Sequence, residues 1–177
     1  MRRFDAPLQV LAGWDEAWCI RCNHAASIAW VRALFRAVSR LGDGIFWYAL
    51  MAGLVVVGGA AALPAVARMG ATAVAGIALY KWLKSRTSRP RPYQVRAVIQ
   101  PGADPLDQFS FPSGHTLHAV SFSILTVAYY PALAWLVAPF ALLVAASRLV
   151  LGLHYPSDVL AGALIGTILA LASLAVA

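Results

Sequence analysis

The stretch TLHAVSFSILTVAYYPALAWLVAPFALLVAA, residues 116–146, contains 31 residues and not one Asp, Glu, Lys or Arg. A helix needs roughly 20 apolar residues to cross the hydrocarbon core of a bilayer, so this stretch is too long for a single crossing. Pro131 lies at its middle, directly after Tyr129 and Tyr130. The stretch therefore predicts two membrane helices joined by a tight turn at Pro131.

The remainder of the chain has the same apolar character. Of 177 residues, 61% are hydrophobic and only 12% charged, and the mean hydropathy is +0.73. Soluble domains carry about 25% charged residues, so an ordinary soluble domain is excluded. Further membrane helices are predicted at 44–63, 69–80 and 159–177. Gly162 and Gly166 form a G-x-x-x-G, which favours close helix contact, although glycine is also simply frequent in membrane helices.

The expected fold is thus an all-α integral membrane helical bundle with five to six transmembrane helices, formed by residues 43–177. Residues 1–42 are expected to form an N-terminal amphipathic segment. Within residues 14–40 three arginines recur every four residues and fall along one helical stripe, at Arg32, Arg36 and Arg40. This spacing predicts one or two amphipathic helices that lie in the membrane interface or on the bundle, with a true crossing left open.

The net charge of +7 indicates that the protein binds negatively charged molecules. The cations gather in loops and at helix ends, which suits lipid headgroups or a phosphate-bearing substrate better than nucleic acid. Membrane lipids are therefore expected partners, and nucleic acid is not.

Counting crossings brings three distant segments to one membrane face. If the chain turns at Pro131, then residues 84–92, 111–116 and 147–158 all lie on the same side. Each segment carries ionisable groups at the edge of an apolar helix. Such groups are costly within hydrocarbon and indicate a functional site.

The cations of these segments match the chemistry of phosphate. Lys84, Arg91 and Arg148 are three permanent donors, and guanidinium groups bind phosphate oxygens in pairs. Ser113 and Gly114 begin a helix, whose free N–H groups and positive dipole favour an anion. Three other arginines are expected to reach lipid headgroups instead: Arg86, Arg89 and Arg96.

Two histidines share this face with a carboxylate. His154 precedes Asp158 by four residues across a proline turn, so Asp158 is expected to orient the imidazole and leave its other nitrogen free to attack. His115 is then the candidate general acid for the leaving oxygen. The three cations would stabilise charge on the transferring phosphoryl group.

These residues together resemble the type 2 phosphatidic acid phosphatase superfamily of membrane lipid phosphatases. Its signature is Lys, six residues and Arg-Pro; then Pro-Ser-Gly-His; then Ser-Arg, five residues, His, three residues and Asp. The three parts stand here, in order, as Lys84 with Arg91-Pro92, PSGH at 112–115, and Ser147-Arg148 with His154 and Asp158. The resemblance covers residues 43–177.

The resemblance implies hydrolysis of a lipid phosphate in two steps. His154 would form a phosphohistidine, Asp158 would orient it, and His115 would protonate the leaving group. Lys84 and Arg91 would bind phosphate together with Arg148, Ser113 and the backbone of Gly114. No metal or cofactor is expected. Candidate substrates are phosphatidate-like lipids, phosphatidylglycerophosphate and polyprenyl (pyro)phosphates.

Two other functions compete with this interpretation. A lipid-phosphate transporter or flippase would bind the same headgroup without hydrolysis, but it has no use for an oriented nucleophile. A vanadate-dependent haloperoxidase has a similar motif, usually in a larger soluble protein. The expected location is a bacterial cytoplasmic membrane, and the face on which the site lies is left open, because the excess of cations on that face nearly vanishes if residues 14–40 cross.

Several other polar residues are expected to have structural roles. Cys19 and Cys22 form one C-x-x-C without a second pair, which favours two ordinary thiols over a metal or redox site. His118 lies on nearly the same helix face as His115, and a packing role is favoured over a metal pair. Asp104 and Asp107 are expected to be solvated loop charges.

Overall fold

The computed structural model describes residues 5–176, and these residues form helices and connecting loops. The elements are α1 (Asp5–His24), α2 (Ala29–Arg40), α3 (Phe46–Gly58), α4 (Leu63–Thr87), α5 (Pro92–Val95), α6 (Gly114–Tyr129), α7 (Ala134–Val150) and α8 (Pro156–Ala175). Short turns of other helical types connect some of them: Ala25–Ser27, Leu41–Ile45, Gly59–Ala62 and Pro131–Leu133. The prediction of an all-α fold is confirmed.

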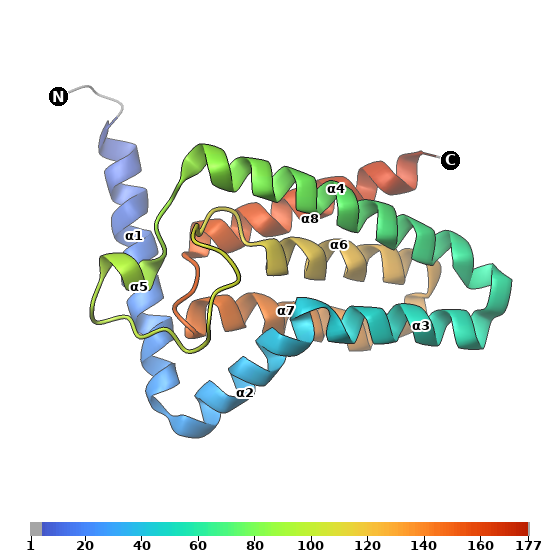
Figure 1. The fold of residues 1–177 in the computed structure, drawn as a ribbon, viewed down its shortest axis with the longest axis horizontal. Helices are drawn as coiled ribbons and strands as arrows, with labels where there is room; N and C mark the ends of the chain where they lie inside the picture. The colour runs from blue at the N-terminus through green and yellow to red at the C-terminus, as the bar shows by residue number, and fades with distance from the viewer. Residues whose placement is uncertain (1–4, 177) are drawn as a thin grey trace.

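The long helices form a bundle, with α1 across one end. Figure 1 shows α3, α4, α6, α7 and α8 running alongside one another, whereas α1 runs across their axes. The loop between α5 and α6 lies at the same end as α1. Helix α6 is central, since it packs against α4, α7 and α8.

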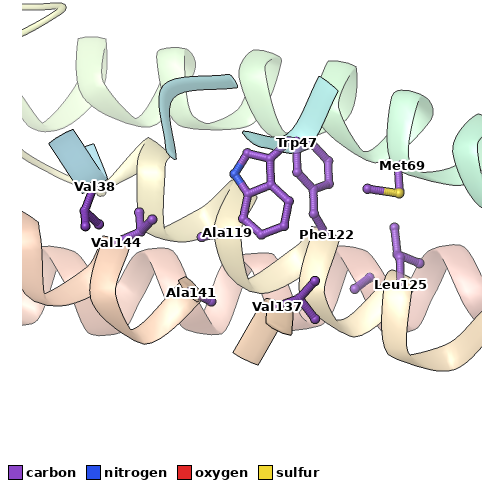
Figure 2. Packing of buried hydrophobic residues seen from close by; sticks show 10 residues of the cluster. Val38, Trp47, Met69, Ala119, Phe122, Leu125, Val137, Ala141 and Val144 are labelled. Carbon is purple, nitrogen blue, oxygen red and sulfur yellow. The ribbon is translucent and has the colours of Figure 1, made fainter. Parts of the chain in front are cut away.

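The core of the bundle is formed by apolar side chains from six helices (Figure 2). Trp47 of α3 is 1% exposed, and its ring lies 5.4 Å from that of Phe122 on α6. The other labelled members are Val38, Met69, Ala119, Leu125, Val137, Ala141 and Val144. Since Val38 belongs to α2, the end of the N-terminal segment is packed into this core.

Helices α6 and α8 approach each other at backbone distance. A Cβ at Gly162 would lie 2.5 Å from the Ser113 carbonyl oxygen, and one at Gly166 would lie 2.4 Å from that of Leu117. Any larger residue at these two positions would therefore push the helices apart. The close contact predicted from the G-x-x-x-G is confirmed, and it joins the two segments that carry His115 and His154.

Three stretches of the described residues are long and apolar enough to span a bilayer: Ala29–Val95, Pro131–Val150 and Pro156–Ala175. The first contains α2, α3 and α4 in succession. Helix α6 has 16 residues, fewer than a typical span. The number of crossings, five to six, stays a prediction.

The predicted boundaries hold at Pro131 and differ at Pro64. Helices α6 and α7 are separated by Pro131–Leu133, as expected. The first turn of the bundle instead falls at Gly58–Ala62, where Gly59 adopts φ +56° and ends α3. Proline is tolerated in the first turn of a helix, and Pro64 lies near the start of α4, which therefore runs for 25 residues.

Candidate active site

A cavity of about 420 Å³ opens at the end of the bundle where α1 lies. Figure 1 shows the end of α4, the start of α6 and the α7–α8 junction together at this end. The structure thus brings the three predicted segments to one place. Six of the predicted site residues line the cavity: Lys84, Arg91, Gly114, His115, Arg148 and His154.

The α7–α8 junction fixes the position of His154. The N–H groups of Leu153 and His154 both donate to the carbonyl of Arg148, at 3.0 and 3.2 Å, which folds the chain back at the end of α7. Gly152 permits this turn because it adopts φ +67°. Asp158 in the first turn of α8 accepts from the N–H of Tyr155 at 2.8 Å and so caps its own helix.

His154 is buried, at 2% exposure, between cations and a carboxylate. Its Nε2 lies 3.4 Å from Arg91 Nη1, and its Nδ1 lies 3.7 Å from Asp158 Oδ2. Burial, followed by the positive charges of Arg148 and Arg91, holds the pKa of His154 well below its usual 6.5. The imidazole is therefore neutral at neutral pH, which is the form that can act as a nucleophile.

Lys84 and Arg91 converge on one carboxylate, that of Asp107. Lys84 Nζ lies 2.7 and 2.8 Å from its two oxygens, and Arg91 Nη2 donates to Oδ1 at 2.8 Å. Burial alone would raise the pKa of Asp107, but the Lys84 ammonium and Arg91 outweigh it and lower that pKa. The prediction that Asp107 is a solvated loop charge is wrong. Its carboxylate is held by two of the three cations that were expected to bind phosphate.

Arg148 is 3% exposed and lines the same cavity. Its Nη1 donates to the hydroxyl of Ser39 on α2, which holds the guanidinium in place. Its Nε has no hydrogen-bond partner among the described residues. A buried N–H without an acceptor lowers the stability of the fold unless a ligand accepts its hydrogen bond. Arg148 is therefore suited to bind an anion in the cavity.

His115 lies at the start of α6 and faces a carboxylate that sequence reasoning missed. Its Nε2 is 3.5 Å from Asp43 Oδ1, in the turn between α2 and α3. His118, one turn further along α6, stacks on Phe122 with ring centroids 5.4 Å apart and also lines the cavity. This arrangement agrees with the packing role favoured for His118.

Ser113 and Gly114 have different positions relative to the cavity. Gly114 lines it, whereas Ser113 is fully buried. The Ser113 hydroxyl caps α6 by accepting from the N–H of Thr116 at 3.4 Å. The N–H of Ser113 donates to the carbonyl of Asp158 at 3.0 Å, which ties α6 to α8. Contact of Ser113 with phosphate stays a prediction.

Arg89 does not reach toward lipid headgroups as predicted. Its guanidinium donates to Asp158 Oδ1 and to Asp15 Oδ2, both at 2.7 Å. Asp15 belongs to α1 and is 1% exposed. Its only sequence signal was an acidic residue within a helix rich in Trp and Leu, a setting in which a carboxylate needs a partner. Arg96 likewise pairs with Glu16 of α1, at 2.7 Å.

Cys19 and Cys22 are free thiols in α1. Cys19 is fully buried, and its Sγ lies 3.7 Å from the carbonyl oxygen of His154. Burial, followed by the charge of Cys22, raises the pKa of Cys19 to about 12. A thiol with this pKa stays protonated and has little reactivity, so Cys19 serves to pack α1 beneath the α7–α8 junction.

Comparison with known proteins agrees with this geometry. The sequence profile of the PAP2 superfamily matches residues 65–177. This chain belongs to the PAP2 superfamily. The matched region contains every predicted site residue, and the superfamily hydrolyses phosphate esters, so the protein is a phosphatase.

Relatives in this superfamily are named as lipid phosphatases. The chain is 37% identical over 134 residues to decaprenylphosphoryl-5-phosphoribose phosphatase of Mycolicibacterium smegmatis, covering 72% of this chain and 68% of that protein. It is 33% identical over 103 residues to undecaprenyl-diphosphatase BcrC of Bacillus subtilis, covering 56% of this chain and 51% of that protein.

A solved structure shares the fold. The transmembrane PAP2 type phosphatidylglycerolphosphate phosphatase from Bacillus subtilis superposes with a TM-score of 0.71 at 26% identity. The superposition covers 94% of this chain and 85% of that one, and so extends well into the N-terminal helices. The protein is an integral membrane phosphatase, and the N-terminal segment contributes more to the likeness than the sequence motifs indicated.

Proposed function

We propose that the protein hydrolyses the phosphate monoester or pyrophosphate of a membrane lipid through a phosphohistidine on His154. The observation that carries the proposal is the position of His154 Nε2. It lies 3.4 Å from Arg91 in a cavity that is also lined by Lys84 and Arg148. A neutral imidazole beside three cations is suited to attack on a phosphate dianion, whose charge the cations neutralise.

The first step would form the phosphoenzyme. His154 Nε2 attacks phosphorus, and the bond between phosphorus and the leaving oxygen breaks. Burial, followed by the charge of Arg148, lowers the pKa of His115, so its protonated form would depend on the bound phosphate dianion and on Asp43, 3.5 Å from its Nε2. Protonated His115 then donates its proton to the leaving oxygen and becomes neutral. Asp158 Oδ2 lies 3.7 Å from Nδ1, which has no hydrogen-bond partner among the described residues. The carboxylate would approach this nitrogen and stabilise the positive imidazole that forms. Lys84 and Arg91 leave Asp107 and bind the phosphoryl oxygens.

The second step would return the enzyme to its starting state. Water attacks phosphorus, the bond to Nε2 breaks, and His115, now neutral, takes the proton from water. Inorganic phosphate then leaves, and neutral His154 is regenerated. The residues supply every proton transfer, and no metal or cofactor takes part in the sequence of steps.

The walls of the cavity support a lipid substrate. Beyond the cations the lining becomes apolar, with Trp47 and Met51 of α3, Ile77 of α4 and Phe122 of α6. A headgroup at His154 would thus leave its hydrocarbon chain against these side chains. The named relatives act on decaprenyl and undecaprenyl lipids, so we propose polyprenyl (pyro)phosphates as substrates, ahead of phosphatidylglycerophosphate and phosphatidate. The proposed location is the cytoplasmic membrane of a bacterium.

The test is phosphate release by the purified protein in detergent, with undecaprenyl diphosphate, phosphatidylglycerophosphate and phosphatidate as substrates. The assay is run with and without EDTA. Wild type is expected to release phosphate equally under both conditions, and His154→Ala is expected to release none. A ³²P-labelled substrate should label wild-type protein with an acid-labile, alkali-stable phosphate.

The same variant separates hydrolysis from transport. Thermal unfolding establishes that His154→Ala is folded. If folded His154→Ala releases phosphate at the wild-type rate, the nucleophile is elsewhere and the proposal is wrong. If wild type releases none but moves a labelled lipid phosphate across liposome membranes, the transporter hypothesis replaces it.

A further inference from the structure

Helix α1 places a buried carboxylate, that of Asp15, against the start of α8, next to the candidate site. It lies across the end of the bundle (Figure 1), and Asp15 points from it to the first turn of α8. Asp15 Oδ1 accepts from the backbone N–H of Ser157 at 2.9 Å, and Oδ2 accepts from the Ser157 hydroxyl. At 1% exposure, this carboxylate is fully removed from solvent. Burying it is costly unless it is paired with a cation.

Arg89 supplies that cation and extends the chain of contacts to Asp158. Its Nη2 binds Asp15 Oδ2 and its Nη1 binds Asp158 Oδ1, each at 2.7 Å. The guanidinium also lies over the ring of Tyr155, 4.1 Å from the ring centroid. The planar fork of an arginine can hold two carboxylates at once in fixed directions. Arg89 therefore joins α1 to the carboxylate beside the nucleophile.

These contacts determine what each oxygen of Asp158 can do. Arg89 binds Oδ1, whereas Oδ2 accepts from the N–H of Tyr155 at 2.8 Å and faces His154 Nδ1 at 3.7 Å. Asp158 is fully buried and does not line the cavity, so no solvent compensates its charge. Without Arg89 it would be a buried carboxylate without the cation that now pairs with it. Its orientation toward the imidazole would then rest on two neutral donors, the N–H of Tyr155 and the side chain of Ser110.

We propose that Asp15 and Arg89 are positioning residues for the nucleophile: Asp15 fixes Arg89, and Arg89 holds Asp158 charged and directed at His154. The proposal rests on the proposed function of His154. Asp15 lies outside the region that matches the superfamily profile, which begins at residue 65. Helix α1 is thus part of the catalytic unit of this protein, beyond any role in membrane attachment.

The same helix provides a matched control. Glu16, next to Asp15, forms an ion pair with Arg96 at 2.7 Å, at the end of α5. Both partners are partly exposed, at 32% and 52% for their side chains, and neither lines the cavity. Glu16→Gln therefore removes a bond between α1 and the rest of the protein without touching Asp158. This variant shows whether a loss of activity comes from weaker packing of α1 on the bundle or from loss of the contacts that position Asp158.

The experiment compares Asp15→Asn, Arg89→Lys and Glu16→Gln in detergent, with the lipid phosphate that wild type hydrolyses best. We expect Asp15→Asn to lower kcat about 10- to 100-fold with KM changed less than threefold, because the phosphate-binding residues are intact. Arg89→Lys keeps the charge but loses the fork, and should also lower kcat at least tenfold. Glu16→Gln should stay within twofold of wild type in kcat.

A double-mutant cycle distinguishes positioning from general destabilisation. In an Asp158→Asn background there is no carboxylate left to position, so adding Asp15→Asn should lower kcat less than twofold further. An independent, multiplicative loss in the double variant would overturn the proposal, as would wild-type kcat in either folded single variant. If wild type itself releases no phosphate from any lipid, the proposed function fails instead, which is a separate outcome.

Discussion

Two carboxylates lie near the cations and the imidazole of the candidate site, and their surroundings differ sharply. Asp107 is on the cavity side, in the loop before α6, with a side chain that is 38% exposed and bound to Lys84 and Arg91. Asp158 is on the far side, in a helix, fully buried and bound to Arg89 and to a backbone N–H. Asp107 contacts two cations that line the cavity, whereas the hydrogen-bond partners of Asp158, Arg89 and the N–H of Tyr155, belong to residues that do not line it.

The difference separates an exchangeable contact from a permanent one. The Asp107 carboxylate offers Lys84 and Arg91 a negative charge and two oxygens, as a phosphate would, and it lies in the loop before α6. Under the proposed function, Asp107 would be a stand-in anion, which pairs with these two buried cations until phosphate takes its place. Under the proposed function, Asp158 would keep its position throughout the reaction. Mutations on the two sides should consequently have effects of different size and of opposite sign.

The largest effect is expected from Asp158→Asn, on the far side. The amide can still cap α8, but it removes the negative charge beside His154 Nδ1 and its donor end can favour the wrong tautomer. We expect kcat to fall by about 10³-fold with little change in KM, in line with losses seen when a carboxylate that orients a catalytic histidine is neutralised. Steady-state kinetics with the same lipid phosphate measure it. A loss smaller than tenfold would mean that His154 needs no orienting carboxylate.

Arg91→Lys should have the next largest effect, since Arg91 belongs to both sides. It donates to Asp107 with Nη2 and to the carbonyl of Leu153, next to His154, with Nη1 at 2.8 Å. A lysine cannot make both contacts with one ammonium. We expect kcat/KM to fall by about 10- to 100-fold, and competitive inhibition by vanadate to weaken in parallel. Unchanged inhibition by vanadate would remove Arg91 from the phosphate site.

The pH profile should reveal how the cations act on His154. Burial and the charges of Arg148 and Arg91 lower the pKa of His154, so the imidazole takes up a proton only below the usual 6.5. A nucleophile must be neutral, and the acidic limb of kcat/KM should accordingly fall below pH 6.5, where activity drops about tenfold per pH unit. Titration of the substrate by ³¹P NMR separates its own ionisation. An acidic limb above 6.5 would mean that carboxylates, not cations, dominate at His154.

The smallest effect, and the opposite sign, is expected from Asp107→Asn. Removing the stand-in anion removes a competitor for Lys84 and Arg91, so phosphate and vanadate should inhibit more strongly, by about two- to fivefold, the range of a partly exposed ion pair. Asp104→Asn, on the same loop, is the control and should change inhibition less. Weaker inhibition in Asp107→Asn would show that Asp107 supports the phosphate site and does not compete for it.

The motif residues could be predicted because they lie at helix ends, and helix ends follow from hydropathy. Once the turn at Pro131 is recognised, counting crossings places Lys84, His115 and His154 on one face. Asp15, by contrast, had no periodic signal. Its role depends on how α1 lies against α8, and α1 has no strongly apolar face from which the sequence could predict that orientation.

The predictions for Arg89 and Asp107 were wrong for a related reason. Both lie in polar connecting segments, where cations and carboxylates are usually solvated, and sequence gives no measure of how a loop of this length folds back. Here Ser110 N donates to the Arg89 carbonyl at 2.9 Å, which closes the loop over the end of the bundle and places Asp107 between two cations. Both side chains are paired with opposite charges because the fold removes them from solvent, and this burial cannot be read from the sequence.

The glycine contact between α6 and α8 has a consequence for how substrate range can change. Where two helix backbones touch without intervening side chains, there is no room for a larger residue. Most substitutions at the contact would therefore be destabilising, and the spacing between His115 and His154 should change little as the rest of the sequence changes. Another wall of the cavity is built from side chains that are not in the buried core, such as Met51 and Ile77, which can be exchanged for larger or smaller ones. We therefore expect changes in lipid preference to come from substitutions on α3 and α4. The positions of the two histidines, set by the contact between α6 and α8, should stay the same.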